Sequence, residues 1–130
     1  MRVSADLHTH TTASDGQYSP TEVSARAKQA GIECLAITDH DTVDGVEEAV
    51  RAGVQSGIRI LRGIELGAKE DGHLHILGLG LEQNCPAMET LCRKLRNSRN
   101  ERKYRIVSFL AEKGIDIDLH EVEALAQGGL

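Results

Sequence analysis

Short apolar runs alternate with amphipathic segments over the first part of the chain. The apolar runs that predict β-strands cover residues 3–7, 34–38, 58–66 and 75–79. Between the second and third runs, Val46, Val50 and Val54 recur at helical spacing before a stop at Gly57. Because helices that connect consecutive strands form right-handed crossovers, this order predicts βα units and a parallel sheet.

The first helix is marked by its ends. Ser19-Pro20-Thr21-Glu22 is a capping box with proline at the first helical position, and Gly31 provides the stop. The strand that follows, residues 34–38, is almost continuously apolar. Such a run is typical of a strand that is buried on both faces of a sheet.

The pattern changes after the third strand. Asp71-Gly72 is a turn signal and predicts that the third and fourth strands pair as a hairpin. From Pro86 the spacing is helical up to a stop at Gly114, and a last short helix is expected from about residue 119 to 126. We therefore divide the chain into βα units, residues 1–85, and a helical segment, residues 86–130.

Composition narrows the class of protein. A chain of 130 residues with 40% hydrophobic residues suits one globular domain, and its three aromatic residues offer no broad platform for stacking bases. No apolar run reaches the roughly 18 residues that span a bilayer, and there is no signal-peptide pattern, so we expect no membrane contact and a cytoplasmic protein. Cys34, Cys85 and Cys92 lack the spacing of a zinc ribbon, and we expect buried or incidental thiols.

The net charge of −5 hides a basic segment. Residues 93–105 hold seven Lys or Arg side chains and a single acid, Glu101. A basic helix beside an acidic metal pocket could hold the non-reacting phosphates of a substrate. Arg99 and Arg102 share a helix face and are the candidates for this contact, although a solvated helix face explains their number equally well.

Histidines and acids recur where the predicted strands end. His8 and His10 are one residue apart, which places both imidazoles on the same side of an extended segment. Further candidates follow later in the chain: Asp15, Asp39, His40, Glu65, and His73 or His75. Such groups would repel or desolvate one another at a common point unless divalent cations lay between them. Imidazole and carboxylate ligands without thiolate favour zinc, manganese or iron.

Asp15 has a second interpretation, and His120 is left out of the candidate ligands. Asp15 precedes Gly16, and an Asp-Gly pair is also common in turns that bind nothing. His120 follows Asp116 and Asp118 on the last predicted helix, where we expect a surface residue.

Four segments carry a family resemblance: residues 6–16 (DLHTHTTASDG), 36–42 (AITDHDT), 63–65 (GIE) and 75–79 (HILGL). They look like the successive motifs of the polymerase and histidinol phosphatase (PHP) superfamily. Residues 98–110 and 126–129 are similar to the helical insertion of its bacterial branch of nucleoside 3′,5′-bisphosphate phosphatases and 5′-3′ exoribonucleases. The resemblance implies an α/β fold, the N-terminal part of a distorted, TIM-like β/α barrel with a helical insertion.

The resemblance also implies hydrolysis of phosphoesters with two or three divalent metal ions. Carried over by position, the implied ligands are His8 and His10 for one ion, Glu65 and His75 for a second, and Asp15 and His40 for a third. Glu65 would bridge the first two ions, and Asp39 would orient its neighbour or a ligand imidazole. Only the resemblance favours His75 over His73.

Relatives in the superfamily continue beyond the last residue of this chain. They supply later strands with another histidine soon after the Gly-Gly, a further histidine and an Asp-x-His pair. We therefore expect a truncated or partial version of the barrel, or a partner chain that completes it, with each metal ion short of a ligand. An open sheet edge would favour self-association.

The expected chemistry follows from the cations. Water bound to a divalent ion has a pKa near neutrality and supplies hydroxide for attack on phosphorus. We hypothesise a metal-dependent phosphoesterase that acts on nucleotides or short RNA. Two alternatives stay open: an amidohydrolase-type metal hydrolase, because such barrels also begin with His-x-His, and a non-catalytic remnant that binds metal weakly.

Overall fold

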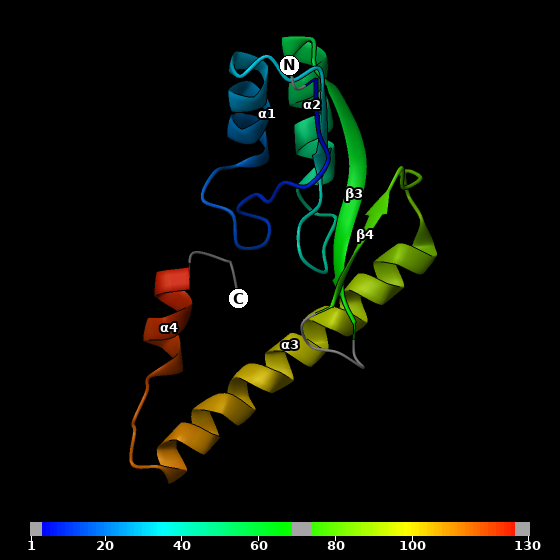
Figure 1. The fold of residues 1–130 in the computed structure, drawn as a ribbon. Coiled ribbons are helices and arrows are strands. Elements are labelled where there is room, and N and C mark those ends of the chain that lie inside the picture. Colours follow the sequence, from blue (N-terminus) through cyan, green and yellow to red (C-terminus); the bar gives the residue numbers. More distant parts are fainter. Residues whose placement is uncertain (1–3, 69–73, 127–130) are drawn as a thin grey trace.

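The fold is α/β, as expected, and Figure 1 shows its arrangement. This computed structural model describes residues 4–68 and 74–126. The elements are β1 (Ala5–Asp6), α1 (Pro20–Gln29), β2 (Cys34–Ile37), α2 (Val46–Ser56), β3 (Arg59–Gly67), β4 (His75–Leu79), α3 (Pro86–Glu112) and α4 (Leu119–Ala126). The α1 and α2 helices lie side by side, and the long α3 helix runs past the ends of β3 and β4 that are joined to each other.

The four strands form one sheet in the order β1-β2-β3-β4. The first three strands are parallel, with Leu35 opposite Ile60, whereas β4 is antiparallel to β3, with His75 opposite Gly67. The predicted parallel βα units and the predicted hairpin are both confirmed; the Asp71-Gly72 turn itself lies outside the described residues. Because β4 runs back along β3, its first residue lies beside the carboxyl end of β3.

The core lies between the sheet and the α1 and α2 helices. Leu35 and Ile37 of β2 pack with Val46 and Ala49 of α2 and with Ile58, which precedes β3. All four residues of β2 are buried, which confirms a strand covered on both faces. The packing leaves the carboxyl ends of the parallel strands free to carry polar groups, as is usual in β/α folds.

The helix ends agree with the sequence signals. The Ser19 Oγ accepts a hydrogen bond from the Glu22 N–H, and the Glu22 carboxylate accepts one from the Ser19 N–H at 2.8 Å. Gly31, Gly57 and Gly114 all have a positive φ, as expected of helix stops. The capping box and the three stops are confirmed.

Val54 lies outside the buried face of α2, although it recurs at helical spacing with Val46 and Val50. Its side chain is 80% exposed, whereas Val46 and Ala49 are buried. A step of four residues advances the helix by about 400°, so each such step drifts about 40° from the buried stripe. Two steps carry Val54 out of the core, and Ala52 and Gly53 take its place.

Smaller differences concern the strand ends and the thiols. The first strand was expected over residues 3–7 and spans Ala5–Asp6, with residue 3 outside the described part. Cys34 and Cys92 are buried as expected, while Cys85 is only partly covered. Within residues 4–68 and 74–126, no helix combines the length and the apolar character needed to cross a bilayer.

Candidate metal centre

Thr9 anchors the segment that carries the first two histidines. Its carbonyl accepts a hydrogen bond from the Thr38 N–H at 2.9 Å, and its hydroxyl donates to the Ala36 carbonyl at 2.6 Å. Because alternate residues of an extended segment point to the same side, His8 and His10 are left facing a common space. Their ring centroids are 5.1 Å apart.

The Glu65 carboxylate is the point on which three imidazoles converge. It is 3% exposed, and its Oε2 lies 2.8 Å from His8 Nε2 and 3.0 Å from His10 Nε2. The other oxygen, Oε1, lies 2.6 Å from His75 Nδ1. The hairpin register explains the last contact, because His75 is opposite Gly67, which is on the same face of β3 as Glu65.

Asp15 and His40 complete the group on its other side. The Asp15 Oδ1 lies 3.2 Å from His10 Nδ1, and its Oδ2 lies 3.7 Å from His40 Nε2. The His40 Nδ1 is 3.7 Å from Glu65 Oε2, and its ring lies 5.0 Å from that of His75. The structure therefore brings all six expected metal ligands to one place. His73, the alternative to His75, lies outside the described residues.

The spacing of these atoms fits divalent cations. Three groups have ligand atoms within 4.8 Å of one another: His8, His10 and Glu65; His10, Asp15 and His40; and His40, Glu65 and His75. Two ligand atoms that share one ion at about 2.0–2.2 Å lie roughly 3 Å apart. Most of the contacts described above are close to that value. The donor set, imidazole and carboxylate without thiolate, suits zinc, manganese or iron.

The protonation states also favour metal binding. Burial acts to raise the pKa of Glu65, but hydrogen bonds from His8 and His75 lower that pKa below its ordinary value. Burial lowers the pKa of His40 and outweighs the opposing attraction of Glu65 and Asp15. An ionised carboxylate and a neutral imidazole are the forms that ligate metal ions.

Asp39 is fully buried and holds the loop between His10 and Asp15. Its Oδ1 accepts hydrogen bonds from the Thr11 N–H at 2.7 Å and from the Ser14 hydroxyl at 2.6 Å, and its Oδ2 accepts one from the Thr11 hydroxyl at 2.8 Å. These contacts join Asp39 to the loop and not directly to an imidazole. No role was expected for Thr11 or Ser14; the signal that could have found them is the run of hydroxyl residues between two candidate ligands.

The two candidate phosphate-binding arginines differ in their surroundings. The Arg99 Nε donates to Asp41 Oδ2 at 2.8 Å, in a partly buried ion pair. Arg102 is exposed and forms no ion pair within the described part of the chain. Arg96 and Lys103, which lie on the same side of α3 as Arg99, are also paired with acids. His120 is exposed, as expected.

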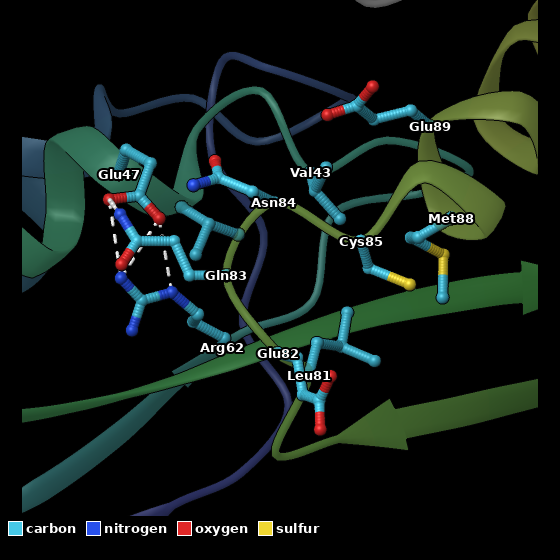
Figure 2. A pocket seen from close by; sticks show the side chains of 11 residues that line it. Val43, Glu47, Arg62, Leu81, Glu82, Gln83, Asn84, Cys85, Met88 and Glu89 are labelled. Carbon is cyan, nitrogen blue, oxygen red and sulfur yellow. Dashed lines mark hydrogen bonds and ion pairs between the residues drawn. The ribbon is translucent and has the colours of Figure 1, made fainter.

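A separate cavity of about 150 Å³ lies beside α2 and the start of α3 (Figure 2). The cavity wall includes Arg62, whose Nη2 lies 2.9 Å from Glu47 Oε1, and Gln83, which donates to Glu47 Oε2 at 3.4 Å. Cys85 and Met88 line its other end. Because Glu47 neutralises the charge of Arg62 and none of the six expected ligands lines the cavity, we place the functional site at the histidine cluster.

Curated relatives share most of this chain. The chain is 39% identical to a 5′-3′ exoribonuclease of Haemophilus influenzae, over 95% of this chain and 45% of that protein. It is also 39% identical to a 3′,5′-nucleoside bisphosphate phosphatase of Chromobacterium violaceum, over 85% of this chain and 39% of the relative. The chain thus spans less than half the length of these relatives.

Solved structures agree with the fold. A candidate metal-dependent phosphoesterase from Bifidobacterium adolescentis matches 95% of this chain and 43% of its own, with a TM-score of 0.82 and 31% identity. An amidohydrolase from Chromobacterium violaceum, solved with bound sulfate and no metal, matches 88% of this chain and 41% of its own, with a TM-score of 0.79 and 37% identity. The PHP domain family matches residues 6–123. The four motifs, the partial β/α barrel and this match together show that the chain belongs to the PHP domain family.

Proposed function

We propose that this chain carries the N-terminal part of a metal-dependent phosphoesterase that hydrolyses phosphate esters of nucleotides or short RNA. The observation that supports this most strongly is the convergence of four imidazoles and two carboxylates on one space beside the strand ends. The relatives named as an exoribonuclease and a bisphosphate phosphatase support the substrate class.

Within this proposal, two or three divalent ions are bound, and they are manganese, zinc or iron. The proposed ligands are His8, His10 and Glu65 for one ion, Glu65 and His75 for a second, and Asp15 and His40 for a third. The contacts of Glu65 support its bridging role, since its Oε2 faces His8 and His10 and its Oε1 faces His75. His40 also lies within reach of the Glu65 and His75 pair, so it is available to the second ion.

The chain supplies charge and geometry to this chemistry. When bound, divalent ions activate water and stabilise the developing charge on phosphoryl oxygens. Glu65 and Asp15 balance part of the positive charge of the ions, and Asp39 fixes the loop that presents Asp15. The neutral form of His40, which its burial favours, keeps a lone pair available for coordination.

The basic segment of α3 is proposed to contact the phosphates that do not react. Arg102 is the stronger of the two candidates, because its guanidinium is exposed and is not paired with an acid of the described chain. Arg99 would have to leave Asp41 before it could reach a substrate phosphate. A nucleotide or RNA substrate is also consistent with a cytoplasmic location, which we keep as part of this proposal.

A second candidate activity has one observation in its favour. A solved structural neighbour is described as an amidohydrolase, and hydrolysis of C–N bonds would use a similar metal centre. A non-catalytic remnant is the third candidate, because the chain spans less than half of the relatives that it matches. The substrates of the test below separate these candidates.

The test is hydrolysis of three substrates by the 130-residue chain with added Mn²⁺: adenosine 3′,5′-bisphosphate, a short 5′-phosphorylated RNA and a small amide. We expect release of phosphate or nucleotide, and a loss of about 100-fold or more in Glu65→Gln, since that change removes the shared carboxylate. Glu33→Gln, at an exposed position, is the matched control. Turnover of amides alone would favour the amidohydrolase, and no turnover in a metal-loaded chain would contradict the proposed activity.

We also propose that the chain self-associates through the open edge of its sheet. Within residues 4–68 and 74–126, β4 is an edge strand, and its Ile76, Leu77 and Leu79 side chains are between 38% and 55% exposed. An exposed apolar edge strand invites pairing with a second chain. Light scattering at high protein concentration should detect dimers or larger species, whereas a strictly monomeric chain would rule out this contact.

A further inference from the structure

Asp41 has an unusual backbone conformation directly beside the metal centre. Its φ is 55°, and among the described residues only Asn84 shares a positive φ without being glycine. The left-handed region is unfavourable for most L-residues and is better tolerated by Asp and Asn, so the contacts around Asp41 have to hold it there. Asp41 is also buried, with 8% of its surface exposed, and it follows His40 in the chain.

Three contacts hold Asp41 in this conformation. Its N–H donates to the Glu65 carbonyl at 2.9 Å, its Oδ1 accepts a long hydrogen bond from the Gly67 N–H at 3.4 Å, and its Oδ2 accepts one from Arg99 Nε at 2.8 Å. The first two contacts join Asp41 to the end of β3. The third joins it to α3, 58 residues later in the chain.

Among the described residues, His40 lacks the close carboxylate contact that the other three imidazoles make. Its ring nitrogens lie 3.7 Å from Asp15 and 3.7 Å from Glu65, whereas His8, His10 and His75 each lie within 3.2 Å of a carboxylate. The His40 side chain is nevertheless the least exposed of the four, at 16%, and its ring lies 4.6 Å from that of His10. The backbone at His40, which Asp41 helps to hold against β3, sets the direction in which this side chain leaves the chain.

We propose that the Asp41–Arg99 ion pair is a positioning device that sets His40 in the metal centre and makes this part of the centre depend on the docking of α3. Arg99 is thereby a positioning residue that acts through Asp41 and the backbone of His40. The inference builds on the proposed metal centre, and its test includes one measurement that requires no metal.

The chain provides a matched control for this ion pair. Arg96 lies three residues before Arg99 on α3, and its Nη2 lies 2.8 Å from Asp44 Oδ2. This second pair joins the same two segments, but both of its side chains are more than half exposed, at 56% and 64%. Exposed ion pairs contribute little to stability, so Arg96→Gln should remove a cation from α3 without disturbing His40.

The first measurement is Mn²⁺ binding to the 130-residue chain by calorimetry. Arg99→Gln and Asp41→Asn should each weaken binding of the Mn²⁺ ion that His40 ligates by about 10–100-fold. This is the usual effect of removing a group that orients a ligand. The double variant should be little weaker than either single variant, because both changes break one pair. Arg96→Gln should stay within about threefold of the unchanged chain. If the affinity for every bound Mn²⁺ ion fell equally and the melting temperature also fell, the ion pair would have a general structural role, and the proposal would be overturned.

The second measurement uses NMR of the histidine rings in the metal-free chain at about pH 9, where the imidazoles are neutral and loss of the Arg99 charge does not change their protonation. Arg99→Gln should shift the ring signals of His40 and leave those of His8 nearly unchanged, and Arg96→Gln should shift neither. Unchanged His40 signals in Arg99→Gln would overturn the positioning role. The NMR result can be interpreted even if the unchanged chain binds no Mn²⁺. Absence of Mn²⁺ binding would count against the proposed function and not against the contact of Asp41 with Arg99.

Discussion

At the scale of single residues, the candidate centre depends on a buried acid that does not face an imidazole directly. Asp39 accepts three hydrogen bonds from Thr11 and Ser14 and is wholly buried. The loop that these bonds fix carries Asp15 into the cluster. Hydrogen bonds to a charged, buried acceptor are among the stronger ones in proteins, because an unpaired partner would be left without water.

Asp39→Asn is expected to lower the free energy of unfolding by about 2–4 kcal/mol, since the new amide group cannot accept every bond that the carboxylate accepts. Thermal or urea unfolding of the metal-free chain measures the change. Asp6→Asn is the control, because Asp6 is exposed and, among the described residues, accepts only a 3.3 Å bond from the His8 N–H. A loss in Asp39→Asn no larger than in Asp6→Asn would show that the loop is held by other contacts.

The candidate ligands could be predicted at this scale, but their supports could not. The spacing of His8 and His10 in the sequence already places two imidazoles on one side of an extended segment. The left-handed conformation of Asp41 and its pairing with Arg99 depend on a contact across 58 residues, and no local pattern encodes such a contact. Thr11 and Ser14 lie in a run of hydroxyl residues that is visible in the sequence, but their hydrogen bonds to Asp39 span 28 and 25 residues and could not be predicted from it.

At the scale of elements, the α2 helix lies unusually close to the sheet. A Cβ added to Gly53 would come within 2.5 Å of Ile60 Cγ1 and 2.8 Å of the Ile58 carbonyl oxygen. Glycine within a helix is normally destabilising by about 1 kcal/mol relative to alanine. Here the absence of a side chain is what permits α2 to pack against β3.

We therefore expect Gly53→Ala to destabilise the chain, by about 1–3 kcal/mol, in spite of the higher helix propensity of alanine. The adjacent Val54→Ala is the matched control, because Val54 is 80% exposed and its loss should change stability by less than about 0.5 kcal/mol. Urea unfolding of both variants gives the comparison. A more stable Gly53→Ala variant would mean that α2 can move away from β3 without loss.

Most elements could be predicted from the sequence, but periodicity alone does not show which residues of α2 are buried. The capping box at Ser19 and the stops at Gly31 and Gly57 fixed the helix ends because each has a local physical cause. The exposure of Val54 shows that a repeat of four residues drifts around a helix of 3.6 residues per turn. The antiparallel direction of β4 followed from the short turn that was expected before it.

At the scale of the whole molecule, two parts meet at the candidate centre. The βα units bring His8, His10, His40 and Glu65 together through strand pairing, and α3 reaches the loop after β2 through Arg96 and Arg99. The chain spans less than half the length of the relatives that it matches. The sequence predicted the order of the parts, whereas the docking of α3 depends on ion pairs between distant segments.

The central claim is that the clustered imidazoles and carboxylates bind divalent ions. The most direct test is the metal content of the purified 130-residue chain, measured by mass spectrometry after incubation with Mn²⁺ and dialysis at about pH 7.5, where most imidazoles are neutral. We predict two or three ions per chain, and a sharp loss of them in Glu65→Gln, in which the carboxylate that faces three imidazoles is gone. Less than one ion per chain, or an unchanged content in Glu65→Gln, would contradict the account.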